Sequence, residues 1–329
     1  MEPKEDGAGR YARGLHVQGT FWSLEKRNPE DLEGLEQEYE KLLRNFRGVL
    51  PAAWFEPPRK PGGRQGGAEV GGAGNPLSAG EDVAGRRGEA CLGRRLAARA
   101  LELDVAVHAN GDACLSASGR GGGGGGRRGR TLVHGDLKTW NVFFRKGGGW
   151  WGTGPTAGAA RHGAAVAAAP AEGRVKFIDW QWCGEALAAA DVAYVMCTSL
   201  EPAVLSRERE LLDHYHAELS RGLEARFGVP PLPSLSVGKR GGASSGSSHG
   251  TAWYPAEQFE DDFRVAFLDY MRCVVGTLWK GLTPEKMEVN RRSGPGLSLI
   301  NRSSQHMQWM IQRATRLLDE LDGVSGVDE

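Results

Sequence analysis

The chain has 329 residues, of which 49 are glycine, and its formal net charge is zero. A neutral charge balance gives no electrostatic basis for binding nucleic acid or an anionic membrane surface. The five cysteines include no CxxC pair, which is typical of reduced thiols in a cytosolic protein. No targeting segment is visible, and no apolar run reaches the ~20 residues of a membrane span. We therefore expect a cytoplasmic protein with neither nucleic acid nor membrane as a partner, and its oligomeric state stays open.

The first part of the chain is predicted to be helical. Residues 1–13 have the composition of a disordered segment, and a short helix is expected over residues 14–24. A longer helix is predicted to begin at Asn28, with Pro29 at its first position, and to end at Pro51. Apolar residues recur along one face of this helix at Leu32, Leu35, Tyr39, Leu42 and Phe46.

Low-complexity segments divide the chain. The helical start at residues 14–56 is followed by a Pro/Gly/Arg-rich insert at 57–90. The remaining folded region, 91–322, is interrupted by further inserts at 116–130, 147–173 and 238–250 and is followed by a tail at 323–329. The polyglycine run in the first of these inserts is not a phosphate-binding loop, because no Lys-Ser/Thr pair follows it.

The folded region is predicted to be mostly helical, with a short β segment in its middle. Strand-like runs are found at Thr131–Val133, Val142–Arg145 and Arg174–Asp179. Helical stripes are found from Leu92, from an N-cap at Ser206 to Gly228, from Phe259 to Leu278 and from Met307 to Leu321. The expected fold class is therefore α+β, with a small β-hairpin among helices.

The unusual polar residues gather in and around the β segment. Residues 132–144, LVHGDLKTWNVFF, carry Asp136 and Asn141 five positions apart, and the run KFIDW places Asp179 at the end of a strand. If the strands around Asn141 and Asp179 pair as a hairpin, these two residues lie close together, with Asp136 on the loop just before. Phosphoryl transfer needs a carboxylate to orient the attacking hydroxyl, and Mg²⁺ prefers carboxylate and amide oxygens.

The same residues carry a family resemblance. His134-Gly135-Asp136 with Asn141, then IDWQ at 178–181 and DVAY at 191–194, resemble the aminoglycoside phosphotransferase/choline kinase superfamily. The sequence is most similar to its choline-kinase-like, ecdysteroid-kinase-like branch, and the likeness extends over most of the chain from Leu92. The implied fold is the mostly helical C-terminal lobe of a protein-kinase-like fold.

The resemblance also implies roles for particular residues. Asp136 would be the catalytic base, and Asn141 and Asp179 would hold Mg²⁺. Lys138 would contact the γ-phosphate of ATP and so act in both catalysis and nucleotide binding. His134 and Asp191 would support the site structurally, and solvated surface is an equal alternative for Lys138.

The resemblance further implies an acceptor and a second lobe. The acceptor would be a small alcohol or amino-alcohol, held between helices at 207–226 and 257–282, with Trp180, Trp182, Asp261 or Asp262 receiving a cationic group. The β-rich N-terminal lobe that covers the nucleotide in such kinases is not visible before Leu132. Two interpretations follow: a small-molecule kinase with its nucleotide lobe truncated, or a catalytically impaired kinase-like binding or scaffold protein.

Overall fold

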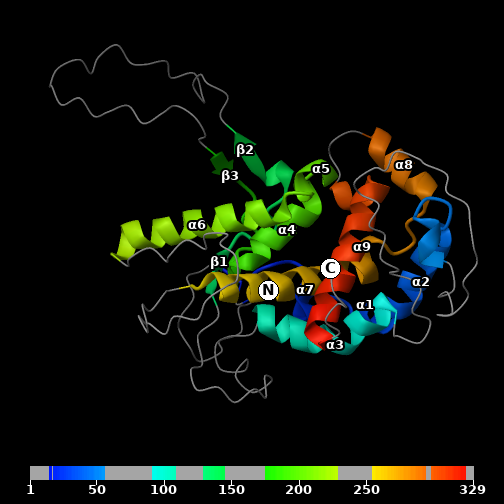
Figure 1. The fold of residues 1–329 in the computed structure, drawn as a ribbon, viewed down its shortest axis with the longest axis horizontal. Helices are drawn as coiled ribbons and strands as arrows, with labels where there is room; N and C mark the ends of the chain where they lie inside the picture. The colour runs from blue at the N-terminus through cyan, green and yellow to red at the C-terminus, as the bar shows by residue number, and fades with distance from the viewer. Residues whose placement is uncertain are drawn as a thin grey trace, which may run out of the picture.

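The computed structural model describes residues 15–16, 18–55, 91–108, 129–144, 175–228, 254–293 and 298–323. This part of the chain is mostly helical and contains two small antiparallel sheets, so the expected α+β class is confirmed (Figure 1). The segment 1–13 and the inserts 57–90, 147–173 and 238–250 lie outside the described residues, as do most of 116–130 and of the tail.

The start of the described chain is not helical, and the helix predicted over 14–24 is wrong. His16 forms a parallel β-bridge with Gly184, and the amides of Gly19 and Thr20 donate to Glu185 O (2.9 Å) and Trp182 O (3.1 Å). A 3₁₀ helix, η1, follows only at Leu24–Lys26. The backbone of this segment thus forms its hydrogen bonds with residues 182–185, which are distant in the sequence. An apolar pattern alone does not reveal such pairing.

The helix predicted from Asn28 to Pro51 is divided into two. Helix α1 spans Pro29–Glu33, with the Asn28 side chain as its N-cap, and α2 spans Leu35–Asn45 after a break at Gly34. The predicted apolar face of α2 is buried, and a short 3₁₀ helix, η2 (Ala52–Phe55), follows. Helix α3 spans Leu92–His108 and packs against α2.

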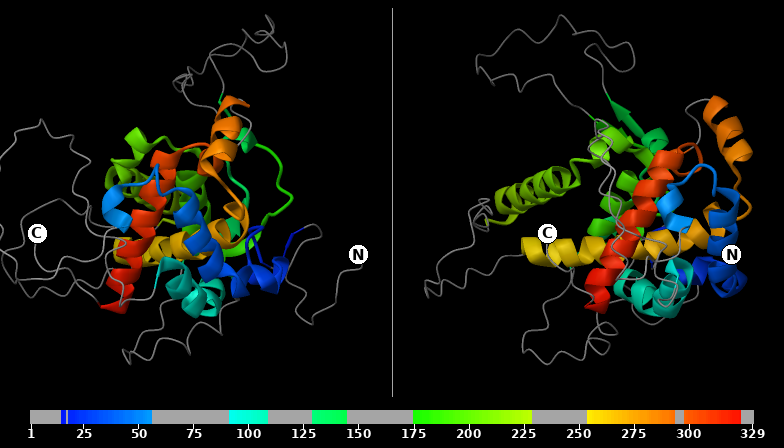
Figure 2. Two further views of the ribbon diagram at one scale, coloured as in Figure 1. Left: turned by 90° about the vertical axis from the view of Figure 1, so that its right-hand side faces the viewer. Right: turned by 45° about the vertical axis from the view of Figure 1, so that its right-hand side comes forward.

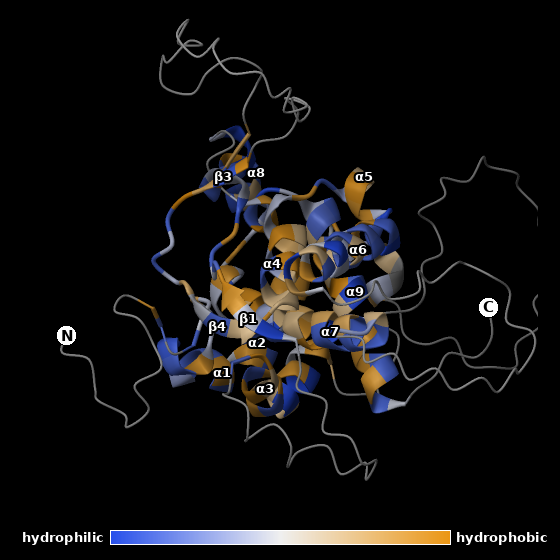
Figure 3. Ribbon diagram, turned by 90° about the vertical axis from the view of Figure 1, so that its left-hand side faces the viewer, coloured by the Kyte–Doolittle hydropathy of each residue, from blue (hydrophilic) through white to orange (hydrophobic). Residues whose placement is uncertain are grey.

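Helix α7 (Ala256–Cys273) is the centre of the helical body. It packs against α3, against α4 (Ala189–Ser199) and against α9 (Ser304–Asp322), and a π-helical turn, η6 (Val274–Leu278), extends it. Apolar residues are concentrated around α4 and the neighbouring strands in Figure 3. The predicted stripes of the last two long helices therefore form the core, as amphipathic helices do.

Two short strand pairs lie beside these helices. Strand β2 (Val142–Phe144) pairs with β3 (Val175–Phe177), so the predicted hairpin is confirmed. Strand β1 (Arg130–Val133) pairs instead with β4 (Gly184–Leu187), in a region that we predicted to be helical. The sequence GEAL has little intrinsic preference for a strand, and it forms one because it pairs with β1.

The remaining helices lie at the periphery. Helices α5 (Pro202–Leu205) and α6 (Glu208–Phe227) meet at Ser206, which is the C-cap of α5 and not the predicted N-cap of α6. Gly228 closes α6 with φ 68°, as predicted. Helix α6 projects from the body (Figure 2), and Leu212 is its only residue that is fully buried. Helix α8 (Pro284–Arg292) and the 3₁₀ helix η7 (Leu299–Asn301) precede α9.

A substitution in α7 tests how much a buried charge of this helix contributes to stability. Asp269 is fully buried and accepts hydrogen bonds from Arg272 (2.7 Å) and His108 (3.0 Å). We expect Asp269→Ala to lower the free energy of unfolding by about 3–5 kcal/mol, because it leaves the buried Arg272 charge without its closest carboxylate, and that of Asp104 lies farther away, at 3.7 Å.

The matched control lies on the same helix. Asp261 forms an exposed ion pair with Arg264 (2.7 Å), so Asp261→Ala should cost less than about 1 kcal/mol. Urea unfolding of the two variants compares them, and equal losses would show that the buried network contributes no more than a surface pair.

Candidate active site

A loop between β1 and the 3₁₀ helix η4 (Thr139–Asn141) carries the polar motif, and its shape depends on a glycine. Gly135 has φ 79°, which glycine adopts without strain. A Cβ atom at this position would lie 2.3 Å from Trp182 O and 2.6 Å from Thr20 N. This close approach explains why a glycine occupies this position.

Asp191 fastens the loop to helix α4. It lies in the first turn of α4, and its two carboxylate oxygens accept from the amides of His134 (2.7 Å) and Gly135 (3.0 Å). Burial raises the pKa of Asp191, whereas the two amide donors favour the charged form. Its side chain contacts the loop and does not cap its own helix.

His134 links the loop to the second strand pair. Its Nδ1 accepts from the amide of Asp136 (3.3 Å), which leaves the proton on Nε2, and Nε2 donates to Ile178 O (2.8 Å). The Trp180 ring packs 4.6 Å from the imidazole. Both nitrogens bond to backbone atoms, so this geometry suits a structural histidine and not a proton relay.

Asp136 is the centre of the arrangement. The residue is 4% exposed; Oδ1 accepts from the Tyr194 hydroxyl (2.6 Å), and Oδ2 forms an ion pair with Lys138 (2.6 Å). The Asn141 amide nitrogen donates to the backbone oxygen of Asp136 (2.8 Å). Lys138 is therefore bound to the carboxylate of the predicted catalytic base.

Asn141 and Asp179 are brought to the same end of the hairpin. The amide of Ile178 donates to Asn141 O (3.0 Å), and Asp179 is the next residue along the chain. Asp179 has φ 65°, a left-handed conformation that is uncommon outside glycine and occurs more often at functional sites. Its exposed side chain forms no hydrogen bond or ion pair with the residues that the structure describes.

Asn141 and Asp179 both carry oxygen atoms of the kind that a hard cation binds. Because Asn141 uses its amide nitrogen on Asp136, its amide oxygen is left as an acceptor, and Asp179 supplies a carboxylate. Amide and carboxylate oxygens are the ligands that Mg²⁺ prefers.

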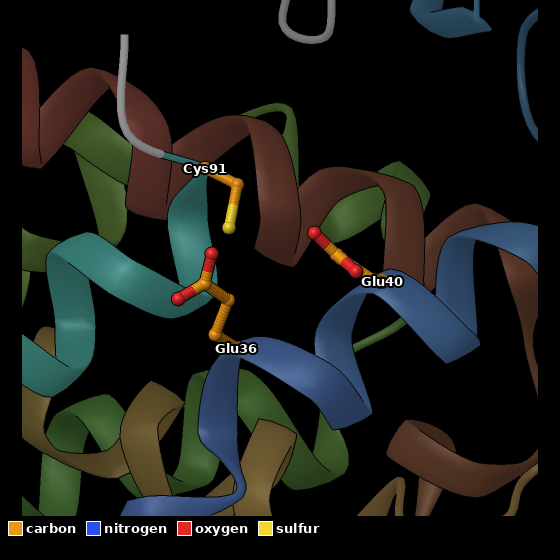
Figure 4. Close-up of side chains that lie close together, drawn as sticks. All are labelled: Glu36, Glu40 and Cys91. Carbon is orange, nitrogen blue, oxygen red and sulfur yellow. The ribbon is translucent and has the colours of Figure 1, made fainter.

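Two other clusters bring together groups that bind metals. Asp104, His108 and Asp269 are buried together, but Arg272 pairs with both carboxylates, so a cation there would face a fixed positive charge. Glu36, Glu40 and Cys91 lie between α2 and the start of α3, as Figure 4 shows.

Arg94 already pairs with Glu36 in that second cluster. None of the residues in either cluster belongs to the elements that carry the polar motif, so both are separate from the site around Asp136.

A cleft of about 570 Å³ opens beside Asp136. Aromatic side chains form much of its wall, and Glu201 supplies a carboxylate. The lining includes Phe21, Asp136, Lys138, Trp140, Trp182, Tyr194, Glu201, Tyr270 and Arg302. This combination of apolar walls and a few polar groups is typical of a small-molecule site.

The cleft walls differ from the predicted ones. Residues of α7 and η6 line the cleft, but none from α6 does. Asp262 is buried and accepts from the Gly129 amide (3.1 Å), while Asp261 is paired at the surface, so neither acid belongs to the cleft. Trp182 does line it, with the Lys26 ammonium 5.5 Å from its ring centroid.

Glu201 and Tyr194 are among the cleft residues that were not singled out from the sequence as site residues. Glu201 lies in the turn between α4 and α5, where an isolated acid carries no periodic signal. Tyr194 was part of a quoted motif, but its bond to Asp136 joins residues 58 positions apart. Such contacts become visible only once the fold is known.

One segment of the chain matches a known protein family. Residues 168–226 match the ecdysteroid kinase-like family. This family is a member of the choline kinase/aminoglycoside phosphotransferase-like superfamily, so the resemblance predicted from the sequence is confirmed. No curated protein and no solved structure matches the chain.

The ecdysteroid kinase-like match covers only part of the site. It includes Asp179, Asp191, Tyr194 and Glu201, whereas the loop with Asp136 and Asn141 lies before it. The helices of the described residues include none long and apolar enough to cross a membrane.

A substitution at Gly135 tests the loop geometry. We expect Gly135→Ala to lower the free energy of unfolding by about 1–3 kcal/mol, because the new methyl group meets rigid backbone and the residue must keep a positive φ.

Gly222 on α6 is the control, since a Cβ there meets no atom within 4 Å. Gly222→Ala should raise stability by up to about 1 kcal/mol. Both are measured by urea unfolding, and a Gly135→Ala protein as stable as the wild type would contradict the proposed constraint.

Proposed function

We propose that this chain transfers the γ-phosphoryl group of Mg·ATP to the hydroxyl of a small molecule. The observation that carries the proposal is the Asp136 carboxylate, held in the wall of a cleft beside Asn141. The ecdysteroid kinase-like match supports a kinase-like phosphotransferase at the level of the family.

The chemical step assigns Asp136 a defined task. The acceptor oxygen forms a bond to the γ-phosphorus, and the bond from that phosphorus to the bridging oxygen of ATP breaks, so ADP leaves with the electron pair. The proton of the acceptor hydroxyl passes to the Asp136 carboxylate. Catalysis of this kind depends mainly on positioning and on charge stabilisation, because phosphoryl transfer asks for little covalent chemistry from the protein.

The negative charge of the ATP phosphates would be neutralised with the help of Asn141, Asp179 and Lys138. Asn141 and Asp179 would hold Mg²⁺, which when bound neutralises charge on the β- and γ-phosphates. Lys138 is partly exposed at 36% of its side chain, so its ammonium is able to exchange Oδ2 of Asp136 for a phosphate oxygen. That exchange would free the carboxylate for the acceptor.

The acceptor is proposed to be a small alcohol or amino-alcohol. Glu201 lines the cleft and forms no ion pair with other described residues, in contrast to Asp136, which pairs with Lys138. Trp140 is exposed and also lines the cleft. A carboxylate and an aromatic face suit an ammonium group, and they replace Asp261 and Asp262 in that role.

Nucleotide binding gives the first test. Mg·ATP at millimolar concentration should raise the thermal unfolding midpoint of the wild type, because a ligand that binds only the folded state stabilises it. Asp179→Ala should lose the Mg²⁺-dependent part of this shift, while Asp213→Ala, at an exposed ion pair on α6, should keep it. The absence of a shift in the wild type would count against the whole site.

Turnover separates catalysis from binding alone. Asp136→Ala should keep the Mg·ATP shift and lower the rate of phosphoryl transfer by about 10²–10⁴-fold, the usual contribution of a general base. Wild-type protein that binds Mg·ATP but transfers no phosphoryl group to water or to a panel of alcohols would support the alternative, a catalytically impaired binding or scaffold protein.

The acceptor assignment is tested with a charged and a neutral alcohol. Glu201→Gln should lower kcat/KM for choline by about fivefold and leave that for a neutral alcohol unchanged, because a partly exposed charge pair is worth about 1 kcal/mol. Glu218→Gln on α6 is the control, since Glu218 pairs with Arg221 away from the cleft. Equal losses for both alcohols would contradict recognition of a cation by Glu201.

A further inference from the structure

Tyr194 is bound to the carboxylate that the proposed reaction uses. Its hydroxyl donates to Asp136 Oδ1 at 2.6 Å, and its side chain is buried. Burial, together with the nearby Asp136 charge, raises the pKa of Tyr194 far above its ordinary value, so the hydroxyl keeps its proton.

The ring of Tyr194 has little freedom to move. It stacks on Trp22 with centroids 5.1 Å apart and an interplanar angle of 11°, and it meets Tyr270 edge-on at 4.9 Å. Phe21 packs against a further side at 5.6 Å. The position of a hydroxyl oxygen on such a fixed ring is more restricted than that of one on a mobile side chain.

The partners of the Asp136 carboxylate are unequal, and the Asn141 amide nitrogen, at 3.4 Å from Oδ2, is the most distant of them. Lys138 bonds Oδ2 through a flexible and partly exposed chain, and in the proposed reaction it leaves for the phosphate. Tyr194 bonds Oδ1 from inside the core and has no other task in the step. When Lys138 departs, Tyr194 still holds Oδ1 at 2.6 Å, while the Asn141 amide nitrogen lies at the longer distance of 3.4 Å from Oδ2.

We propose that Tyr194 is a positioning residue, whose hydroxyl holds Asp136 Oδ1 so that Oδ2 faces the acceptor hydroxyl. This inference rests on the proposed function. Tyr194 does not itself exchange a proton with the acceptor: the acceptor proton passes to Oδ2, and the Tyr194 hydroxyl keeps its own. Its effect is therefore transmitted entirely through Asp136.

The test follows from this dependence on Asp136. Tyr194→Phe removes one oxygen and keeps the stacked ring, and Tyr215→Phe on α6 is the matched control, since Tyr215 lies outside the cleft. The probes are Mg·ATP with choline and the hydrolysis of Mg·ATP by water. We expect Tyr194→Phe to lower kcat about tenfold with KM for ATP within twofold of the wild type, while Tyr215→Phe leaves both unchanged.

The double variant decides between positioning and general structure. In an Asp136→Ala background, adding Tyr194→Phe should leave the residual rate unchanged, since residues that act as a unit are not additive. A tenfold loss in both backgrounds, or a loss of the Mg·ATP thermal shift in Tyr194→Phe, would overturn the inference in favour of a structural role. Unchanged kcat in folded Tyr194→Phe would overturn it as well.

Failure of the inference differs from failure of the proposed function. An active wild type with an equally active Tyr194→Phe variant removes only the role of Tyr194. A wild type that transfers no phosphoryl group to choline or to water removes the proposed function, and the role of Tyr194 falls with it.

Discussion

The buried carboxylate of Asp269 is the interaction on which the rest of the structure depends. It accepts from Trp22 Nε1 (3.1 Å), His108 Nε2 (3.0 Å) and Arg272 (2.7 Å), which belong to the first described segment, to α3 and to α7. A charge in the core is tolerated only when its partners are all in place, because its desolvation is costly. These three parts of the chain are therefore fixed against one another at a single point. The contacts of Asp269 also extend to the candidate site, since its partner Trp22 stacks on Tyr194 and Tyr194 bonds Asp136.

The loop of the polar motif is held from two sides in a comparable way. Asp191 binds the amides of His134 and Gly135 from helix α4, and the His134 ring binds Ile178 O at the end of β3. The hairpin that carries Asp179 is therefore connected to the loop that carries Asp136 through His134 and also through Asn141, which bonds both Asp136 O and the Ile178 amide. Rigid support of this kind is what phosphoryl transfer demands, because a displacement of about 1 Å costs roughly two orders of magnitude in rate.

The sequence was informative where local chemistry decides the structure. The polar residues of the motif are hard to explain as a simple turn, and the apolar stripes of α2, α3, α7 and α9 follow helical spacing, so these features were predicted. The misassigned segments depend on distant partners. His16, Gly19 and Thr20 bond to residues 182–185, and β4 pairs with β1 over more than 50 positions. Short segments of this kind carry little structural preference of their own. The place of Glu201 in the cleft and the bond between Tyr194 and Asp136 could not be predicted for the same reason. Both depend on residues that are distant in the sequence and close in the fold.

The surface of the β2–β3 hairpin adds a last constraint on the proposed function. Phe143, Phe144, Phe177 and Ile178 are all exposed, Phe144 to 71%, on the element that presents Asn141 and Asp179. Exposed apolar groups gathered on one small element are unfavourable in water and typically mark a binding surface. A nucleotide joins a flat, largely apolar base to its phosphates, and its phosphates require the charged residues at the base of this hairpin. The proposed binding of Mg·ATP would account for the apolar surface and the adjoining candidate oxygen ligands together, whereas an anion bound at the loop alone would leave the hydrophobic hairpin unexplained.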